Sequence, residues 1–126
     1  MVGLSTLTVV IAEDSALMRD QLAHYLSQVD SLEVVGIAVD GPQALEAVAR
    51  LKPHLLILDV SMPLQDGLSV LREIRKENSR TVVAMFTADP SSTLRTICLE
   101  AGANFFFAKS QMLELIEVCR QELRMR

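Results

Sequence analysis

The sequence is poor in features that mark several large classes of protein. It has two cysteines, Cys98 and Cys119, and each lies in a stretch with helical apolar spacing. Two such thiols argue against the disulfide framework of small secreted domains and predict reduced, buried side chains in a cytosolic protein. The two histidines, His24 and His54, stand at no spacing that suits a metal site, so each is interpreted as a helix-face or pre-strand residue.

Basic clusters and long apolar runs are missing as well. The chain has 12 Lys and Arg against 16 Asp and Glu, a net charge of -4, with no basic cluster that could follow a phosphate backbone. This argues against direct binding of nucleic acid. The apolar runs are far shorter than a membrane span, and the first one breaks at Glu13-Asp14 with no basic segment before it. We therefore expect a soluble, uncleaved, cytoplasmic chain that does not engage a membrane.

What the sequence does contain is a regular alternation of two kinds of segment. Its 126 residues, half of them hydrophobic, fit one compact domain, which we expect to span residues 1–126. Several of the apolar runs are apolar nearly throughout, as expected for parallel strands covered by helices on both faces. The runs that predict strands are Leu7 to Ala12, Leu32 to Ala38, Leu55 to Leu58, Thr81 to Phe86 and Asn104 to Phe107.

Segments with helical spacing follow these runs, and their ends carry capping signals. Asp40-Gly41-Pro42-Gln43 resembles a capping box with a proline in the first turn, Asp89-Pro90 repeats the cap-then-proline signal, and Gly102 supplies a helix stop. The last helix is expected to start after Ser110 as N-cap and to place Leu113, Ile116, Cys119 and Leu123 on one face. The alternation predicts an α/β fold with a parallel sheet, right-handed crossovers and helices on both faces.

Polar side chains stand at the carboxyl ends of four of the five predicted strands. In open parallel sheets, ligands bind outside these strand ends. Three carboxylates in one place repel one another, so unless one of them stays protonated they need a cation, and their oxygen atoms suit Mg²⁺. A lysine ammonium and a threonine hydroxyl beside them could donate to phosphoryl oxygens. The residues concerned are Glu13, Asp14, Asp59, Thr87 and Lys109.

Each of these residues also has an ordinary structural interpretation. Asp14 could cap the first helix, Asp59 could form a turn, Thr87 could fill a strand, and Lys109 could be a solvated loop lysine. None of these interpretations predicts that the polar strand ends converge on one edge of a sheet. Their joint placement therefore favours a functional site.

The same residues lie in motifs that resemble the receiver domain of two-component response regulators, and the resemblance covers essentially the whole chain. The motifs are Val10 to Ser15, Leu58 to Pro63 followed by Asp66-Gly67, Phe86-Thr87-Ala88, and Ala101-Gly102-Ala103 leading to Phe106 and Lys109. The resemblance implies a five-stranded parallel sheet of order 2-1-3-4-5 flanked by five helices, the order that a chemotaxis member of the family illustrates.

The resemblance also implies a role for each strand-end residue. Asp59 would accept a phosphoryl group from a phosphohistidine of a sensor histidine kinase or phosphotransfer protein, giving an acyl phosphate that water later hydrolyses. Mg²⁺ would be held by Asp14, Asp59 and the backbone carbonyl of Ser61, with Glu13 acting through a water on the metal. Thr87 and Lys109 would contact the phosphoryl oxygens, and Lys109 would pair with the carboxylates before phosphorylation.

Switching in this family couples Thr87 to an aromatic position, here Phe106. The hydroxyl moves toward the phosphoryl group and the ring packs into the vacated space. The output surface would be formed by helix four, strand five and helix five, and would act on an effector domain, often a DNA-binding one, on a partner, or on a second copy in a phosphorylation-dependent homodimer.

Two further positions, Ser110 and Asp89, bear on the geometry of the site. Most receivers have proline after the lysine, often with a cis peptide bond, whereas Ser110 follows Lys109 here. A cis bond before a non-proline residue costs roughly 2.5 to 4 kcal/mol, so we expect a trans bond. Asp89, two residues after Thr87, either steers the hydrolytic water or caps the fourth helix, and the cap is the favoured interpretation.

Three other functions compete with this interpretation. A hydrolase of the haloacid-dehalogenase type needs a second aspartate two residues after the nucleophile, where this chain has Ser61. A flavodoxin-type binder of small anions is disfavoured because Glu13-Asp14 would repel an anion. A receiver-like interaction module that is not regulated by phosphorylation stays open.

Overall fold

Strands and helices alternate along the chain, as the sequence pattern predicts. The computed structural model describes residues 6–124. Within them, no helix is both long enough and apolar enough to cross a membrane. The elements are β1 (Leu7–Ala12), α1 (Ala16–Ser27), β2 (Leu32–Ala38), α2 (Gly41–Leu51), β3 (Leu55–Asp59), α3 (Gly67–Lys76), β4 (Val82–Thr87), α4 (Ser92–Glu100), β5 (Phe105–Ala108), a 3₁₀ turn (Lys109–Gln111) and α5 (Met112–Arg124).

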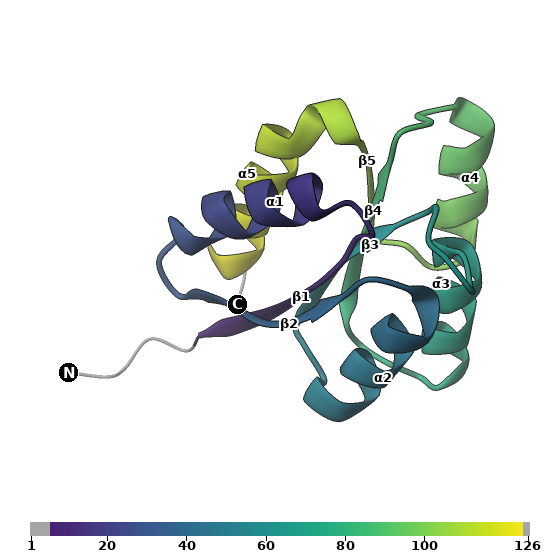
Figure 1. Cartoon of the computed structure of the whole chain (residues 1–126), viewed down its shortest axis with the longest axis horizontal. Coiled ribbons are helices and arrows are strands. Elements are labelled where there is room, and N and C mark those ends of the chain that lie inside the picture. The colour runs from purple at the N-terminus through teal and green to yellow at the C-terminus, as the bar shows by residue number, and fades with distance from the viewer. Residues whose placement is uncertain (1–5, 125–126) are drawn as a thin grey trace.

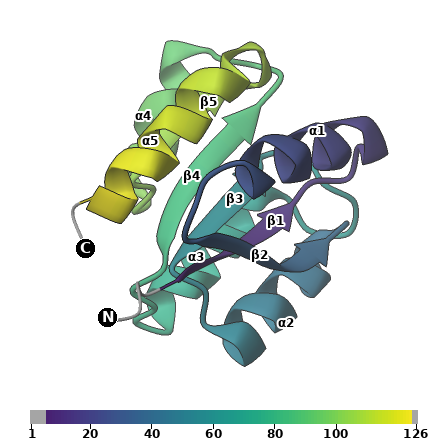
Figure 2. The same cartoon turned by 90° about the vertical axis from the view of Figure 1, so that its left-hand side faces the viewer.

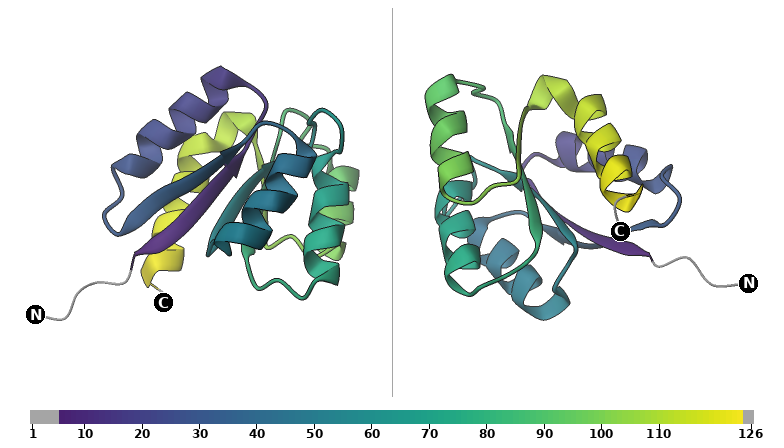
Figure 3. Two further views of the ribbon diagram at one scale, coloured as in Figure 1. Left: turned by 60° about the horizontal axis from the view of Figure 1, so that its bottom comes forward. Right: turned by 180° about the vertical axis from the view of Figure 1, so that it is seen from behind.

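The five strands form one parallel sheet in the order β2-β1-β3-β4-β5, which confirms the expected α/β fold and strand order (Figure 2). Helices α1 and α5 cover one face, and α2, α3 and α4 cover the other (Figures 1 and 3). In strand β1, apolar side chains point to both faces of the sheet, so helices must pack on both faces. Val9 and Ile11 pack in the core cluster with α1 and α5, whereas Val10 and Ala12 pack in the cluster with α2 and α3. All four side chains are fully buried.

Side-chain caps fix where four of the helices begin. Each cap oxygen accepts a hydrogen bond from the backbone N–H three residues later, which satisfies a donor that the helix leaves free. Asp40 has the predicted role, because its carboxylate accepts from Gln43 N at 2.8 Å. The prediction that Asp89-Pro90 starts the fourth helix is wrong, since Ser91 Oγ accepts from Leu94 N at 3.1 Å instead. The four caps are Ser15, Asp40, Asp66 and Ser91.

The last helix differs from its prediction in both its start and its buried face. Ser110 is not the N-cap, because it lies inside the 3₁₀ turn that precedes Met112. Ile116 and Cys119 are buried as predicted, and Met112 and Leu115 share their stripe. Leu113 was predicted on this face but is 66% exposed, and the side chain of Leu123 lies outside the described part. The buried side chains are Met112, Leu115, Ile116 and Cys119.

One arginine joins three elements at the amino-terminal edge of the sheet. Arg75, near the end of α3, donates to the carbonyl oxygens of Gly102 at 2.9 Å, Ser79 at 3.1 Å and Thr81 at 2.8 Å, and to Asn104 Oδ1 at 2.9 Å. Its guanidinium thus connects the end of α3 to the start of β4 and to the α4–β5 turn. Gly102 has a φ of 110°, so the predicted helix stop uses a backbone conformation that glycine adopts easily.

We predict that Arg75→Met lowers the free energy of unfolding by about 2 to 4 kcal/mol, because several half-buried acceptors lose a charged donor at once. Urea denaturation followed by circular dichroism measures the change. Arg72→Met, at an exposed position on the same helix, is the matched control and should cost less than about 0.5 kcal/mol. Equal losses in the two variants would contradict the role assigned to Arg75.

Candidate functional site

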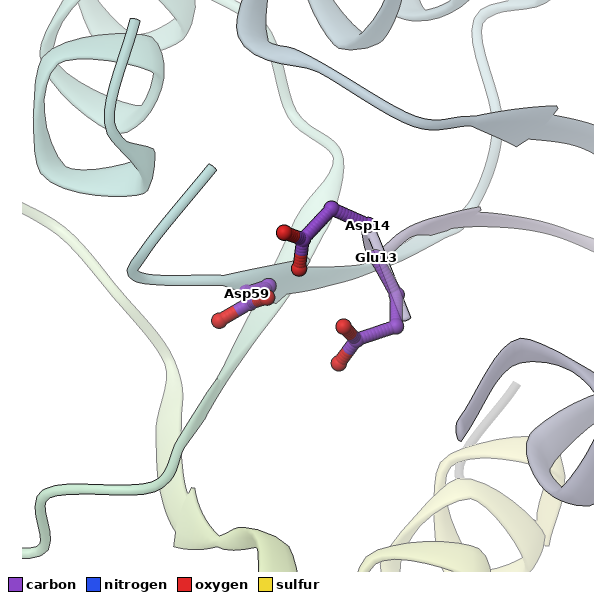
Figure 4. Close-up of side chains that lie close together, drawn as sticks. All are labelled: Glu13, Asp14 and Asp59. Atoms are coloured by element: carbon purple, nitrogen blue, oxygen red, sulfur yellow. The ribbon is translucent and has the colours of Figure 1, made fainter. Parts of the chain in front are cut away.

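Three carboxylates meet at the carboxyl-terminal edge of the sheet (Figure 4). Glu13 and Asp14 follow β1, and Asp59 is the last residue of the neighbouring strand β3. One oxygen from each carboxylate lies within 4.8 Å of the others. Glu13 and Asp59 are buried, with 0% and 1% of their surface exposed, whereas Asp14 is exposed. The structure therefore brings together the three acidic residues that the sequence singles out.

Backbone amides hold the two buried carboxylates in place. Ser15 N donates to Glu13 Oε2 at 2.9 Å, and Ser61 N donates to Asp59 Oδ1 at 3.0 Å. In both cases the donor lies two residues after the acid, so the loop that follows the strand orients the carboxylate. Amide donors to a carboxylate are charge-assisted and stronger than neutral hydrogen bonds.

Arg19 supports the loop that carries Glu13 and Asp14, and the sequence analysis did not identify it. Its guanidinium, on the first turns of α1, donates from one nitrogen to the carbonyl oxygens of Glu13 and Asp14, both at 3.0 Å. The backbone of this loop is therefore fixed from the helix side. A lone arginine with helical neighbours gives no sequence signal for such contacts, because surface arginines are common.

Lys109 lies between the two buried carboxylates. Its ammonium is 3.0 Å from Glu13 Oε1, 3.2 Å from Glu13 Oε2 and 3.3 Å from Asp59 Oδ2. The lysine side chain is 18% exposed, so these ion pairs are poorly screened by water. Lys109 comes from the end of β5, and the ammonium thus connects the far edge of the sheet to its centre.

The electrostatics of the site leave it short of positive charge. Burial raises the pKa of Asp59 to about 7, and the adjacent Glu13 adds to the increase through its hydrogen bond and its charge. The Ser61 amide and Lys109 act in the opposite direction without cancelling the effect. For Lys109, burial alone would lower the pKa, but Glu13 and Asp59 outweigh it and the pKa is raised. One ammonium does not neutralise three carboxylates.

The donor set fits a divalent cation. Glu13 Oε1 is buried and accepts no hydrogen bond, although the Lys109 ammonium is close enough to form an ion pair with it. Three carboxylates offer hard oxygen donors, which Mg²⁺ prefers over the nitrogen and sulfur ligands of Zn²⁺. A cation here would counteract the burial and the nearby Glu13 charge, which both raise the pKa of Asp59. The acidic cluster is therefore consistent with a Mg²⁺ site.

Thr87 and Phe106, the two predicted switch residues, contact different partners. Thr87 is the last residue of β4 and is buried, and its hydroxyl accepts a hydrogen bond from Asp89 N at 2.9 Å. Within residues 6–124, its hydroxyl forms no hydrogen bond with the carboxylates or with Lys109. Phe106 is 7% exposed and packs in the core cluster on the side of α2, α3 and α4.

The peptide bond after Lys109 is trans, as predicted, since residues 6–124 contain no cis peptide bond. A cavity of about 820 Å³ between the carboxyl-terminal ends of α2 and α3 lies at the opposite edge of the sheet, where β3 and β4 begin. None of the three carboxylates lines it. The acidic cluster, rather than this cavity, has the arrangement that suits ionic chemistry.

Known proteins resemble the chain in sequence and in fold. Residues 9–120 match the family model of the response regulator receiver domain. Protein-glutamate methylesterase/protein-glutamine glutaminase 5 of Myxococcus xanthus is 43% identical over 104 residues, which are 82% of this chain and 30% of that protein. The corresponding protein of Geobacillus kaustophilus is 36% identical over 107 residues, 84% of this chain and 31% of its own length. The chain thus spans a third or less of the curated relatives it matches.

Solved receiver structures superimpose closely on the chain. The signal receiver domain of the response regulator NarL from Mycobacterium tuberculosis has a TM-score of 0.89 at 30% identity, covering 97% of this chain and 99% of that one. The response regulator domain of Thermotoga maritima CheB has a TM-score of 0.84 at 26% identity, covering 95% of each chain. The similarity therefore extends over nearly the whole chain.

The raised pKa of Asp59 predicts that Asp59→Asn stabilises the fold, and more so at higher pH. Between the ordinary pKa of 3.8 and about 7, the unfolded chain releases the Asp59 proton while the folded chain retains it. The wild type therefore loses stability as pH rises through this range. In urea titrations with EDTA, we expect the gain from Asp59→Asn to be larger at about pH 8 than at about pH 5 by roughly 1 to 2 kcal/mol.

Asp66→Asn is the control for this experiment. Asp66 is exposed and caps α3, and asparagine is an equally good N-cap. Its effect on stability should change little with pH over the same range. A gain from Asp59→Asn that is independent of pH would contradict the raised pKa.

Proposed function

The chain belongs to the response regulator receiver domain family, and we propose that Asp59 accepts a phosphoryl group from a phosphohistidine of a sensor histidine kinase or phosphotransfer protein. The observation that supports this most directly is the cluster of Glu13, Asp14 and Asp59, in which the Lys109 ammonium contacts Glu13 and Asp59. It combines a nucleophilic carboxylate, a place for a cation and a positive side chain within a few ångströms. Such preorganised charges stabilise phosphoryl transfer.

In the proposed reaction, a carboxylate oxygen of Asp59 attacks phosphorus in line with the leaving nitrogen. An O–P bond forms and the P–N bond of the phosphohistidine breaks; the imidazole keeps the electron pair and takes a proton from solvent. The acceptor must be ionised to attack, whereas burial and the adjacent Glu13 raise the pKa of Asp59 to about 7. Extra positive charge beside Asp59 would therefore favour the reaction.

We propose that Mg²⁺ supplies this charge, held by Asp14, Asp59 and the backbone carbonyl of Ser61, with Glu13 contributing through water. When bound, the ion offsets the charge of the transferred phosphoryl group. The loop contacts of Glu13 and Asp59 orient their carboxylates before any ligand arrives. Lys109, already 3.3 Å from Asp59 Oδ2, is placed to contact a phosphoryl oxygen once that carboxylate is esterified.

The proposed switch couples Thr87 to Phe106. For the Thr87 hydroxyl to turn toward a phosphoryl group, it must give up its hydrogen bond with Asp89 N. The β4–α4 loop that contains Asp89 would then lose one of its attachments to the strand. Phe106 lies on neighbouring strand β5, so repacking of its ring would follow on the face formed by α4, β5 and α5. This face is the proposed output surface, for an effector domain, a partner or a second copy.

Exposed leucines near the acidic cluster support docking of a protein phosphodonor. Leu17 at the start of α1, Leu64 in the β3–α3 loop and Leu113 at the start of α5 are 64%, 84% and 66% exposed. Leu64 also has a φ of 70°, in a turn closed by a hydrogen bond from Gln65 N to Pro63 O at 2.8 Å. This conformation is costly for a residue with a side chain and is typical of functional loops. These side chains belong to elements that begin or end at the acidic edge.

The proposal also covers the extent of the domain, its location in the cell and its output. The domain would occupy residues 1–126 in the cytoplasm and act as a signalling switch rather than as an enzyme on a separate substrate. A DNA-binding effector following the domain is one proposed output, and the methylesterase/glutaminase names of the curated relatives suggest an enzymatic one. The alternative is an interaction module that folds in the same way but is not regulated by phosphorylation.

We predict that acetyl phosphate with Mg²⁺ adds one phosphoryl group to the wild type and none to Asp59→Asn. Intact-mass spectrometry would show the adduct, and hydroxylamine should remove it because it is an acyl phosphate. Asp66→Asn, which retains the helix cap, should be labelled like the wild type. An unlabelled wild type, or labelling that persists in Asp59→Asn, would contradict the proposal. Rapid turnover of phosphate esters would favour a hydrolase instead.

We also predict that Asp14→Asn weakens Mg²⁺ binding by about tenfold or more, because one of the three carboxylates no longer carries a charge; tenfold corresponds to about 1.4 kcal/mol. Isothermal titration calorimetry with MgCl₂ measures the affinity. Asp20→Asn, at an exposed site on α1, is the charge-matched control and should bind Mg²⁺ like the wild type. Equal affinities for Asp14→Asn and the wild type would remove Asp14 from the site.

A further inference from the structure

The backbone that carries Lys109 is held by the side chain of Gln111. Strand β5 ends at Ala108, and Lys109 begins a 3₁₀ turn that ends at Gln111. Gln111 Oε1 accepts a hydrogen bond from Ala108 N at 2.9 Å, across the start of this turn. Because Ala108 N can only donate, the amide oxygen of Gln111 must face the strand. The Gln111 side chain therefore joins the two ends of the short segment that contains Lys109.

The NH₂ group of the Gln111 side chain also has a hydrogen-bond partner. Gln111 Nε2 donates to Glu114 Oε2 at 3.2 Å, in the first turn of α5. This agrees with the orientation that Ala108 N requires. Gln111 thus connects the last residue of the strand to the helix that follows, and it is half-buried.

The hydrogen bond between Gln111 Oε1 and Ala108 N is important because the Lys109 side chain is long and flexible. Four methylene groups separate its ammonium from its Cα, so the aim of the ammonium depends on how well the backbone is fixed. The ammonium must reach Glu13 at 3.0 Å and Asp59 at 3.3 Å, both on other strands. The next residue, Ser110, is exposed and has no ring to fix its φ. Rigidity at this joint therefore depends strongly on the Gln111 bond.

We propose that Gln111 is a positioning residue that aims Lys109 at the acceptor carboxylate through its hydrogen bond with Ala108 N. The inference rests on the proposed function, since its consequence is a faster phosphoryl transfer to Asp59. Gln111 itself touches neither the carboxylates nor the transferred group. Its contribution passes entirely through the backbone of Ala108 and Lys109.

The experiment measures initial rates of Asp59 phosphorylation by acetyl phosphate at saturating Mg²⁺. Gln111→Met keeps the length of the side chain but removes the acceptor, and we expect a rate about fivefold lower, because small misplacements of a charged group slow transfer. Gln111→Glu combined with Glu114→Gln keeps an acceptor for Ala108 N and restores a donor at position 114 for the second carboxylate oxygen, so it should retain at least about half of the wild-type rate. Glu114→Gln removes the charge at the other end of the Gln111 amide and should leave the rate unchanged.

The same variants in a Lys109→Met background separate positioning from general loosening. Lys109→Met retains Asp59 and the carboxylates, so a residual rate is expected. If Gln111 acts through Lys109, Gln111→Met causes no further loss in this background, which a double-mutant cycle shows as full coupling. An equal loss in both backgrounds, or a wild-type rate for Gln111→Met alone, would overturn the inference.

Hydrogen exchange of the Ala108 amide tests the bond without any phosphoryl group. Exchange should accelerate by about tenfold or more in Gln111→Met and stay slow in Glu114→Gln and in the combined Gln111→Glu and Glu114→Gln variant. Unchanged exchange in Gln111→Met would overturn the proposed contact. If circular dichroism shows that Gln111→Met does not fold, Gln111→Ala takes its place. Failure of the wild type to be labelled would sink the proposed function as well, whereas a labelled wild type with an unaffected Gln111→Met would sink this inference alone.

Discussion

The structure depends on the burial of two carboxylates, Glu13 and Asp59, side by side at the end of parallel strands. A buried charge is costly unless it is paired, and two like charges make the cost larger. The chain meets this cost with backbone amides from Ser15 and Ser61 and with the Lys109 ammonium. These donors do not fully compensate the buried negative charge, and the pKa of Asp59 remains raised. A site that is left short of positive charge is consistent with the proposed Mg²⁺ site.

The parallel sheet is what makes this arrangement available. All carboxyl strand ends lie at one edge, so β1, β3 and β5 can each deliver a side chain to one place although Glu13 and Lys109 are 96 positions apart. Both faces of the sheet are covered, which excludes water from the strand ends and keeps Glu13 and Asp59 dry. Gly67 completes the packing, because a Cβ there would collide with the carbonyl oxygen of Asp59. The fold and the charge imbalance therefore arise from the same packing.

The sequence pattern was sufficient for the β/α alternation and for the acidic cluster, whereas the strand order 2-1-3-4-5 was implied by the resemblance to receiver domains. Apolar runs locate strands, and polar residues directly after them fall at one edge. Hydrogen bonds between a side chain and the backbone of a residue in another element were not predictable from the sequence. Arg19 and Arg75 bind backbone carbonyls, and any residue offers those, so nothing in the sequence marks the partner. The start of α5 was missed because Ser110 is a common N-cap, whereas the 3₁₀ turn is fixed by Gln111 Oε1 on Ala108 N.

Strand β5 limits the kind of movement that could reach the proposed output face of α4, β5 and α5. Its three phenylalanines alternate between the two core clusters: Phe106 faces α2, α3 and α4, whereas Phe105 and Phe107 pack toward α1 and α5. A slip of one residue along β4 would exchange these faces and expose all three rings to the wrong core. Sliding of the strand is therefore excluded, and rotation of the Phe106 side chain remains. Any signal that passes through β5 must be small in amplitude and local, a change of rotamer rather than a change of register.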